Sequence, residues 1–130
     1  MPPVNDRRVS FLGEFGGLGH PVAGHLWRDF DQGKAALGEK TEGGWGYGGI
    51  ADTKTREGLE KAYLGLMEKL GDLAEQGLAG SVYTQTADVE IEINGLLTYD
   101  RRVLKFDPAV LGPSHEKIIR RANDAAQRQH

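Results

Sequence analysis

The stretch VSFLGEFGG (residues 9–17) begins with a short, mostly apolar run and continues into Glu14, which is flanked by glycines. An apolar run stopped by a glycine is typical of a strand in a parallel sheet, which is buried on both faces. A second run, SVYTQT (81–86), is rich in residues that favour strands. The clearest helix signal of the chain lies between the two runs. The order strand, helix, strand predicts a βαβ unit with two parallel strands.

The helix between the strands is predicted from about Thr55 to Gln76. Its apolar residues recur at spacings of three and four, which places them on one face of a helix. Thr55 is suited to cap the first turn, and Gly77 follows the expected C-terminus. A last helix is predicted to open at Pro113-Ser114, within the basic C-terminal segment 108–130.

Composition limits the classes of protein to which the chain can belong. Its 130 residues suffice for one ordinary domain, and the absence of cysteine excludes disulfides, thiolate zinc sites and cysteine nucleophiles. No apolar run is long enough to span a membrane, and residues 1–8 read as an extended, polar lead without the apolar core of a signal peptide. We therefore expect no membrane partner, and a cytoplasmic location is the default expectation.

The distribution of charge is uneven along the chain. Residues 1–100 carry 9 basic and 16 acidic side chains, whereas residues 101–130 carry 7 basic and 3 acidic ones. The formal net charge of the whole chain is −3. An acidic balance argues against a nucleic-acid partner, because such partners select basic surfaces.

Glycine is concentrated after the first strand, with twelve glycines between residues 13 and 49. This composition predicts a long irregular excursion over 16–55. The glycines directly after the first strand (13, 16, 17 and 19) do not follow the G-x-G-x-x-G spacing, and Pro21 with Gly24 would break the helix that should receive the pyrophosphate. No G-x-x-x-x-G-K-[ST] motif occurs either, so no nucleotide cofactor is expected. Trp45 and Tyr47 lie among these glycines, where their rings either stack on the apolar face of a sugar or pack the loop against the protein.

Several side chains near the two predicted strands are candidates for chemistry. Glu14 follows the first strand and is flanked by glycines that let a ligand approach, which suits a nucleophile or base; the alternative is an ordinary loop carboxylate. His20 and His25 are either metal ligands or sugar contacts, or else solvated or backbone-bonded histidines without a metal. Tyr83, Thr84 and Gln85 end the second strand, where site residues gather in parallel α/β folds.

The segment DVEIEI (88–93) alternates carboxylates with apolar residues, which indicates a strand. Asn94-Gly95 is a turn signal, and LLTY (96–99) would form the second arm of a hairpin. Three carboxylates on one strand face repel each other, so they require solvent, basic partners or a cation such as calcium. Arg101 and Arg102 are the candidate partners.

Several blocks of the sequence together resemble a known family of enzymes. The blocks are FLGEFGG (11–17), WGY (45–47), the helix near 57–76, VYTQTADVE (82–90) and NGLLTYDR (94–101). Taken in order, they resemble the C-terminal part of the catalytic barrel of glycoside hydrolase family 2, which includes β-galactosidases, β-glucuronidases and β-mannosidases. The resemblance covers roughly residues 9–107. It implies an α/β fold in the form of a partial (β/α)8 TIM barrel, with 9–12 as strand 7, 59–76 as helix 7 and 81–86 as strand 8.

The resemblance also implies an activity, the retaining hydrolysis of β-glycosides without a cofactor. In that mechanism one carboxylate forms a glycosyl-enzyme and a second serves as acid and then as base. Glu14 matches the nucleophile, and Tyr83 matches the aromatic residue that lines the sugar site after strand 8. The expected substrate-binding residues are Trp45, Tyr47, Tyr83, Gln85 and His20.

One departure from the family concerns the acid/base. In the family it is the Glu of an Asn-Glu pair after strand 4, and no Asn-Glu pair occurs in this sequence. Strands 1–6 are also missing, so the chain is expected to be a truncated fragment, inactive alone, whose partner is a chain carrying those strands. The alternatives are a non-catalytic module that binds a sugar or docks onto another subunit, and a basic tail (101–130) that binds an acidic partner.

Overall fold

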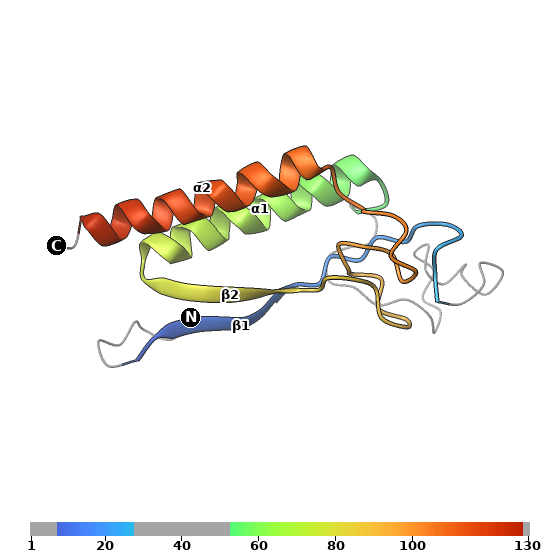
Figure 1. Ribbon diagram of the computed structural model, residues 1–130, viewed down its shortest axis with the longest axis horizontal. Helices are drawn as coiled ribbons and strands as arrows, with labels where there is room; N and C mark the ends of the chain where they lie inside the picture. The colour runs from blue at the N-terminus through green and yellow to red at the C-terminus, as the bar shows by residue number, and fades with distance from the viewer. Residues whose placement is uncertain (1–7, 28–52, 129–130) are drawn as a thin grey trace.

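The computed structural model describes residues 8–27 and 53–128 as a small α/β unit. Four elements follow one another: β1 (Ser10–Gly16), α1 (Arg56–Glu75), β2 (Leu78–Thr84) and α2 (Pro108–Gln127). The two strands pair in parallel, and both helices lie on the same side of the strand pair (Figure 1). The helices therefore form one layer and the strands another.

The expected partial (β/α)8 barrel is wrong. In the described residues a single parallel strand pair lies under α1 and α2, and α2 packs lengthwise along α1 (Figure 1). A barrel wall instead requires a sheet that continues from strand to strand until it closes. Short sequence blocks specify local elements, and they do not specify how many strands pair or whether a sheet closes.

The predicted order of strand, helix and parallel strand is confirmed, with shifted boundaries. The first strand extends to Gly16, and the second begins at Leu78, three residues before the expected start. The helix begins and ends within one residue of the prediction. The Thr55 side chain caps it by accepting a hydrogen bond from the Gly58 N–H at 3.1 Å, and Gly77 follows it with a φ of 99°.

Helix α2 begins five residues before the expected opening at Pro113-Ser114. The Asp107 carboxylate caps it by accepting from the Ala109 N–H at 2.8 Å, and Pro108 occupies the first helical position. A proline is favourable there because its missing N–H would have no partner within the helix. Pro113 instead lies inside the helix. The earlier Asp-Pro pair, and not Pro113, therefore starts this helix.

The hairpin expected over 88–99 is also wrong. This region contains only isolated bridges, among them Val89 with Glu92 and Leu97 with Leu104, and no strand. Asn94 belongs to no exposed turn, because it is completely buried. Side-chain contacts, described below, replace the ladder of a hairpin.

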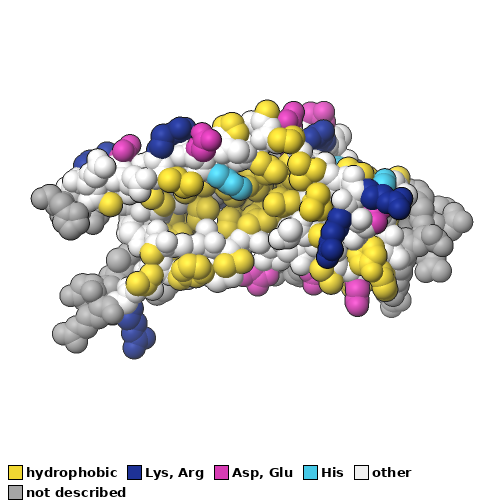
Figure 2. All heavy atoms as spheres, viewed as in Figure 1, with side chains coloured by type: hydrophobic (Ala, Val, Ile, Leu, Met, Phe, Trp, Pro, Cys, Tyr) yellow, Lys and Arg dark blue, Asp and Glu magenta, His cyan; other side chains and the backbone are white. Residues whose placement is uncertain are grey.

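The hydrophobic core lies between the strand pair and the helix layer. Its buried members are Leu18, Leu59, Tyr63, Met67, Leu70, Leu78 and Phe106. The predicted apolar face of α1 is confirmed, since Leu59, Tyr63 and Leu70 all belong to this core. Figure 2 shows hydrophobic side chains gathered in the hollow between helices and strands. That hollow is a pocket of about 340 Å³ whose walls include Tyr63, Tyr83 and Ile118.

Strand β1 contains one extra residue near its end. Leu12 pairs with Ser81 and Phe15 pairs with Tyr83, so three steps along β1 match two steps along β2. Leu12 and Phe15 both pack against the core, although an odd number of steps separates them. A β-bulge of this kind re-aims the side chains that follow it. Here it leaves Glu14 exposed on the surface.

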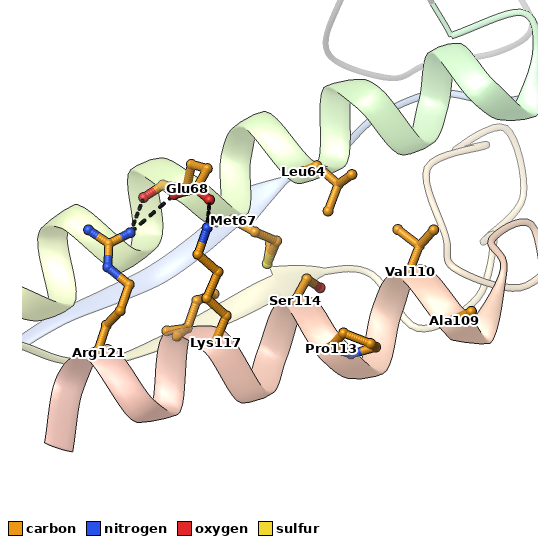
Figure 3. A pocket seen from close by; sticks show the side chains of 10 residues that line it. Leu64, Met67, Glu68, Ala109, Val110, Pro113, Ser114, Lys117 and Arg121 are labelled. Atoms are coloured by element: carbon orange, nitrogen blue, oxygen red, sulfur yellow. Dashed lines mark hydrogen bonds and ion pairs between the residues drawn. The ribbon is translucent and has the colours of Figure 1, made fainter. Parts of the chain in front are cut away.

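The helix layer is held together by Arg121 of α2. Its guanidinium contacts three α1 carboxylates: Asp72 at 2.6 Å, Glu75 at 2.8 Å and Glu68 at 3.2 Å. Lys117 also pairs with Glu68, as Figure 3 shows beside a cavity of about 380 Å³. The hydrogen bond from Arg121 lowers the pKa of the Glu75 carboxyl.

Gly71 makes room for this guanidinium, and its replacement by alanine tests the contact. A Cβ at Gly71 would lie 2.3 Å from Nη1 of Arg121. Alanine is favoured over glycine in a helix by about 1 kcal/mol. We predict that Gly71→Ala raises the free energy of unfolding by up to that amount in an Arg121→Ala background, and by clearly less in the wild type. Urea unfolding measures both values.

Gly65, in the same helix, is the matched control, because a Cβ there would meet nothing within 4 Å. Gly65→Ala is expected to stabilise both backgrounds equally. An equal gain from Gly71→Ala in the two backgrounds would show that Arg121 does not occupy the space above Gly71.

Candidate functional site

Glu14 and Thr84 meet where the two parallel strands end. The Thr84 hydroxyl donates a hydrogen bond to Oε1 of Glu14 at 3.2 Å. The Thr84 carbonyl accepts one from the Gly17 N–H at 2.8 Å, which continues the strand pairing beyond β1. Thr84 therefore holds the Glu14–Gly17 segment through both its side chain and its backbone.

An open pocket of about 280 Å³ adjoins the Glu14 carboxylate. It is lined by Glu14, Phe15, Gly16, Gly17 and Thr84. Gly16 has a φ of 102°, and a Cβ there would lie 2.5 Å from Cε2 of Tyr83, so no other residue fits without displacing that ring. One side of the pocket is therefore bare backbone, which a ligand can approach closely.

Tyr83 lies on the core side of the strand pair. Its ring packs edge-on against Phe15 and Tyr63, each with a centroid distance of 5.4 Å. Burial raises the pKa of the Tyr83 phenol well above its ordinary value. Successive side chains of a strand point to opposite faces, so Thr84 lines the pocket beside Glu14. The sequence places Thr84 at the end of the second strand but not among the expected substrate-binding residues, and strand alternation is the signal that distinguishes it from Tyr83.

The side chain of Gln85 is tied into the loop that follows β2. Its Nε2 donates to Oε2 of Glu92 at 3.0 Å and to Oδ1 of Asn94 at 2.7 Å. Asn94 is completely buried. The structure thus assigns the Gln85 amide to organising this loop next to the pocket.

His20 is buried and bonded to backbone. Its ring Nδ1 lies 2.5 Å from the carbonyl oxygen of Thr53, and its backbone N–H donates to the Ile93 carbonyl at 2.9 Å. Of the roles that the sequence allows for His20, which are a metal ligand, a sugar contact or a backbone-bonded histidine, the structure shows the backbone-bonded one. Trp45 and Tyr47, the other expected sugar contacts, lie outside the described residues.

Asp88 forms a buried ion pair with Lys105, with 2.6 Å between Oδ1 and Nζ. Oδ1 also accepts the Gly95 N–H at 2.8 Å, and Nζ donates to the Ile93 carbonyl at 2.9 Å. Burial raises the pKa of Asp88 and lowers that of Lys105, while their mutual attraction opposes both shifts. For Asp88, the expectation that Arg101 or Arg102 supplies the basic partner is wrong, because Lys105 occupies that place.

A second polar pair joins two loops at the surface. Nδ1 of His25 lies 2.8 Å from Oδ2 of Asp100. The other carboxylate oxygen accepts from the Thr98 hydroxyl at 2.7 Å and from the Arg102 N–H at 3.1 Å. These contacts, led by those of Thr98 and His25, lower the pKa of Asp100 to about 2.

Two findings limit what the described residues can bind. Within 8–27 and 53–128, no three His, Asp or Glu side chains are grouped so that they could hold a metal ion. Neither α1 nor α2 is long and apolar enough to cross a membrane.

The chain matches none of the protein-family models against which it was compared, and no curated protein matches it. The resemblance to glycoside hydrolase family 2 thus stays a prediction that depends on the quoted blocks of sequence.

The buried pair Asp88–Lys105 is the first target for mutation. Lys105→Met leaves a carboxylate buried without its partner, which costs about 3–5 kcal/mol. We predict a loss of that size in the free energy of unfolding, measured with urea, and a large recovery when Asp88→Asn is added. The exposed pair Arg120–Glu116 is the matched control, because Glu116→Gln is expected to change stability by less than about 1 kcal/mol. A loss no larger than that of the control would contradict the role of the pair.

The lowered pKa of Asp100 predicts how the stability of the fold changes in acid. Because its pKa is lowered to about 2 in the folded state, it stabilises the fold above its ordinary pKa of about 3.9. That contribution disappears as the pH falls through about 2. The stability difference between wild type and Asp100→Asn is therefore expected to be largest near pH 5 and to shrink between about pH 4 and pH 2. Urea midpoints across this range measure it, and a difference that does not change with pH would contradict the assignment.

Proposed function

We propose that this chain supplies the nucleophile of a retaining β-glycosidase site, with Glu14 as the nucleophile and a β-glycoside as the substrate. The observation that carries the proposal is the position of Glu14. Its carboxylate is exposed at the end of a parallel strand, beside a pocket walled by glycine backbone. Ligands of parallel α/β folds bind outside the carboxyl ends of the strands. The sequence blocks that resemble glycoside hydrolase family 2 support the choice of reaction.

In the proposed reaction the Glu14 carboxylate attacks the anomeric carbon of the sugar. The bond from that carbon to the leaving oxygen breaks, and a second group protonates this oxygen. Water, deprotonated by the same group, then releases the sugar with its configuration retained. The hydroxyl of Thr84 binds Oε1 of Glu14, which orients the carboxylate and leaves Oε2 for the attack.

The second carboxylate comes from a partner chain in this proposal. A retaining site needs the two carboxyl groups about 5–5.5 Å apart. Within this chain, Asp88 is buried against Lys105, and Glu92 is hydrogen-bonded by Gln85. General acid catalysis supplies about 10²–10⁴ in rate, so the chain alone is a poor catalyst for ordinary glycosides.

A second candidate function, docking onto another subunit, is favoured by one observation. Val9, Phe11 and Val82 are 75 %, 59 % and 48 % exposed, although all three are large and apolar. Exposed apolar side chains that lie near one another mark interaction surfaces. The two candidates are compatible, because the first requires a partner chain.

An activated substrate tests the nucleophile without the partner. In a 2,4-dinitrophenyl 2-deoxy-2-fluoro-β-glycoside, the leaving phenolate needs no protonation, and the fluorine slows release of the sugar from the enzyme. We predict that the galactoside or the glucoside forms an ester with Glu14 as dinitrophenolate leaves. Intact-mass spectrometry detects the adduct, and peptide mapping locates it.

Glu14→Gln is expected to abolish the adduct, and Thr84→Val to slow its formation about tenfold or more, the size of one lost hydrogen bond to a charged group. Thr84→Ser, which keeps the hydroxyl, is the matched control and is expected to react normally. An adduct at another residue, or none with either sugar, would remove Glu14 as the nucleophile.

A further inference from the structure

Two aromatic side chains lie exposed and in contact on neighbouring loops. The rings of Trp27 and Tyr99 have a centroid distance of 4.7 Å and meet at 68°. Trp27 is 48 % exposed and Tyr99 is 39 % exposed. The two residues come from segments far apart in the sequence, so the fold brings them together. Together they form a corner of two partly exposed aromatic rings.

A fixed polar pair flanks this corner. His25 and Asp100 are two and one residues away along the chain, and their side chains are 28 % and 31 % exposed. The Thr98 hydroxyl and the Arg102 N–H hold the Asp100 carboxylate in place. Hydrogen-bonding groups that are already held in position lose little entropy when they bind a ligand.

We propose that Trp27, Tyr99, His25 and Asp100 form a saccharide-binding platform, distinct from the pocket of Glu14. A pyranose ring has an apolar face of C–H groups and a rim of hydroxyls. The two aromatic rings suit the apolar face, and the imidazole and carboxylate suit the hydroxyls. The choice of a saccharide rests on the proposed function, whereas the position of the platform does not.

The experiment uses the full chain labelled with 5-fluorotryptophan. The sequence contains two tryptophans, so two fluorine signals are expected, and Trp27→Phe assigns them. Methyl β-D-galactoside and methyl β-D-glucoside are the probes. We expect a saturable shift of the Trp27 signal at millimolar concentrations of at least one of them.

Variants separate a stacking role from a structural one. Tyr99→Ala is expected to weaken sugar binding at least tenfold, whereas Tyr99→Phe, which keeps the ring, retains it. Ile119→Ala is the matched control, because Ile119 is an exposed apolar residue on α2, at 59 %. Circular dichroism shows whether Tyr99→Ala is folded. If it is not, Asp100→Asn is used in its place, and this variant is expected to weaken sugar binding although both aromatic rings are intact.

Three results would overturn the platform. The first is a Trp27 signal that does not respond to either sugar, and the second is sugar binding by Tyr99→Ala and Asp100→Asn that equals that of the wild type. The third is a Trp27 signal that changes with protein concentration and not with sugar, which indicates a protein-docking surface. The two measurements, both made on the wild-type chain, separate the two proposals. A sugar response at Trp27 that persists while no adduct forms at Glu14 refutes the proposed function alone, and an adduct without that response refutes the platform alone.

Discussion

The buried ion pair between Asp88 and Lys105 organises the chain after β2. Residues 85–107 contain no helix or strand, so side chains must hold them in place. The pair does this from the interior, because its carboxylate oxygen also receives the Gly95 N–H and its ammonium also binds the Ile93 carbonyl. Two charges in a dry interior are tolerated only together. The loop therefore loses stability when either charge is removed alone.

The effect of this pair reaches both layers of the fold. Two residues after Lys105, Asp107 caps α2, and its own N–H donates to Oε1 of Glu60 in α1 at 2.7 Å. Phe106, between them, is 1 % exposed and packs in the core against Tyr63. At the start of the same loop, Gln85 directly follows Thr84, and its side chain is hydrogen-bonded to Asn94. The position of the Glu14 pocket and the start of α2 thus depend on one loop.

The sequence predicts well what local chemistry decides. Helix α1 follows from its apolar periodicity and from the cap at Thr55, and the parallel strands follow from two short apolar runs separated by that helix. The prediction fails where distant residues decide. Lys105 lies 17 residues from its partner Asp88, and Arg121 lies about 50 residues from the carboxylates that hold it. No periodicity reports such contacts, so the alternating pattern over 88–99 predicts a hairpin where the structure has a loop. The barrel is implied by resemblance alone, and short blocks of sequence do not determine how many strands pair.

In the candidate site, too, local features could be predicted from the sequence and contacts between distant residues could not. The position of Glu14 at a strand end could be read from the pattern of residues, because apolar runs and glycines are local signals. Its contact with Thr84 could not, because the bulge in β1 changes which side chains face the core. Tyr83 was the more conspicuous residue at the end of the second strand, and the pairing of the strands turned it toward Tyr63 instead.

The extra residue in β1 makes this strand tolerant of changes at Gly13. A Cβ at Gly13 would meet nothing within 4 Å, so many side chains fit there. Deletion of Gly13 would let β1 match β2 step for step, and Glu14 would then follow Leu12 directly. Regular alternation would still place Glu14 on the face opposite Leu12, with Phe15 toward the core. Both a longer side chain at position 13 and a strand one residue shorter are therefore compatible with an exposed carboxylate at this strand end.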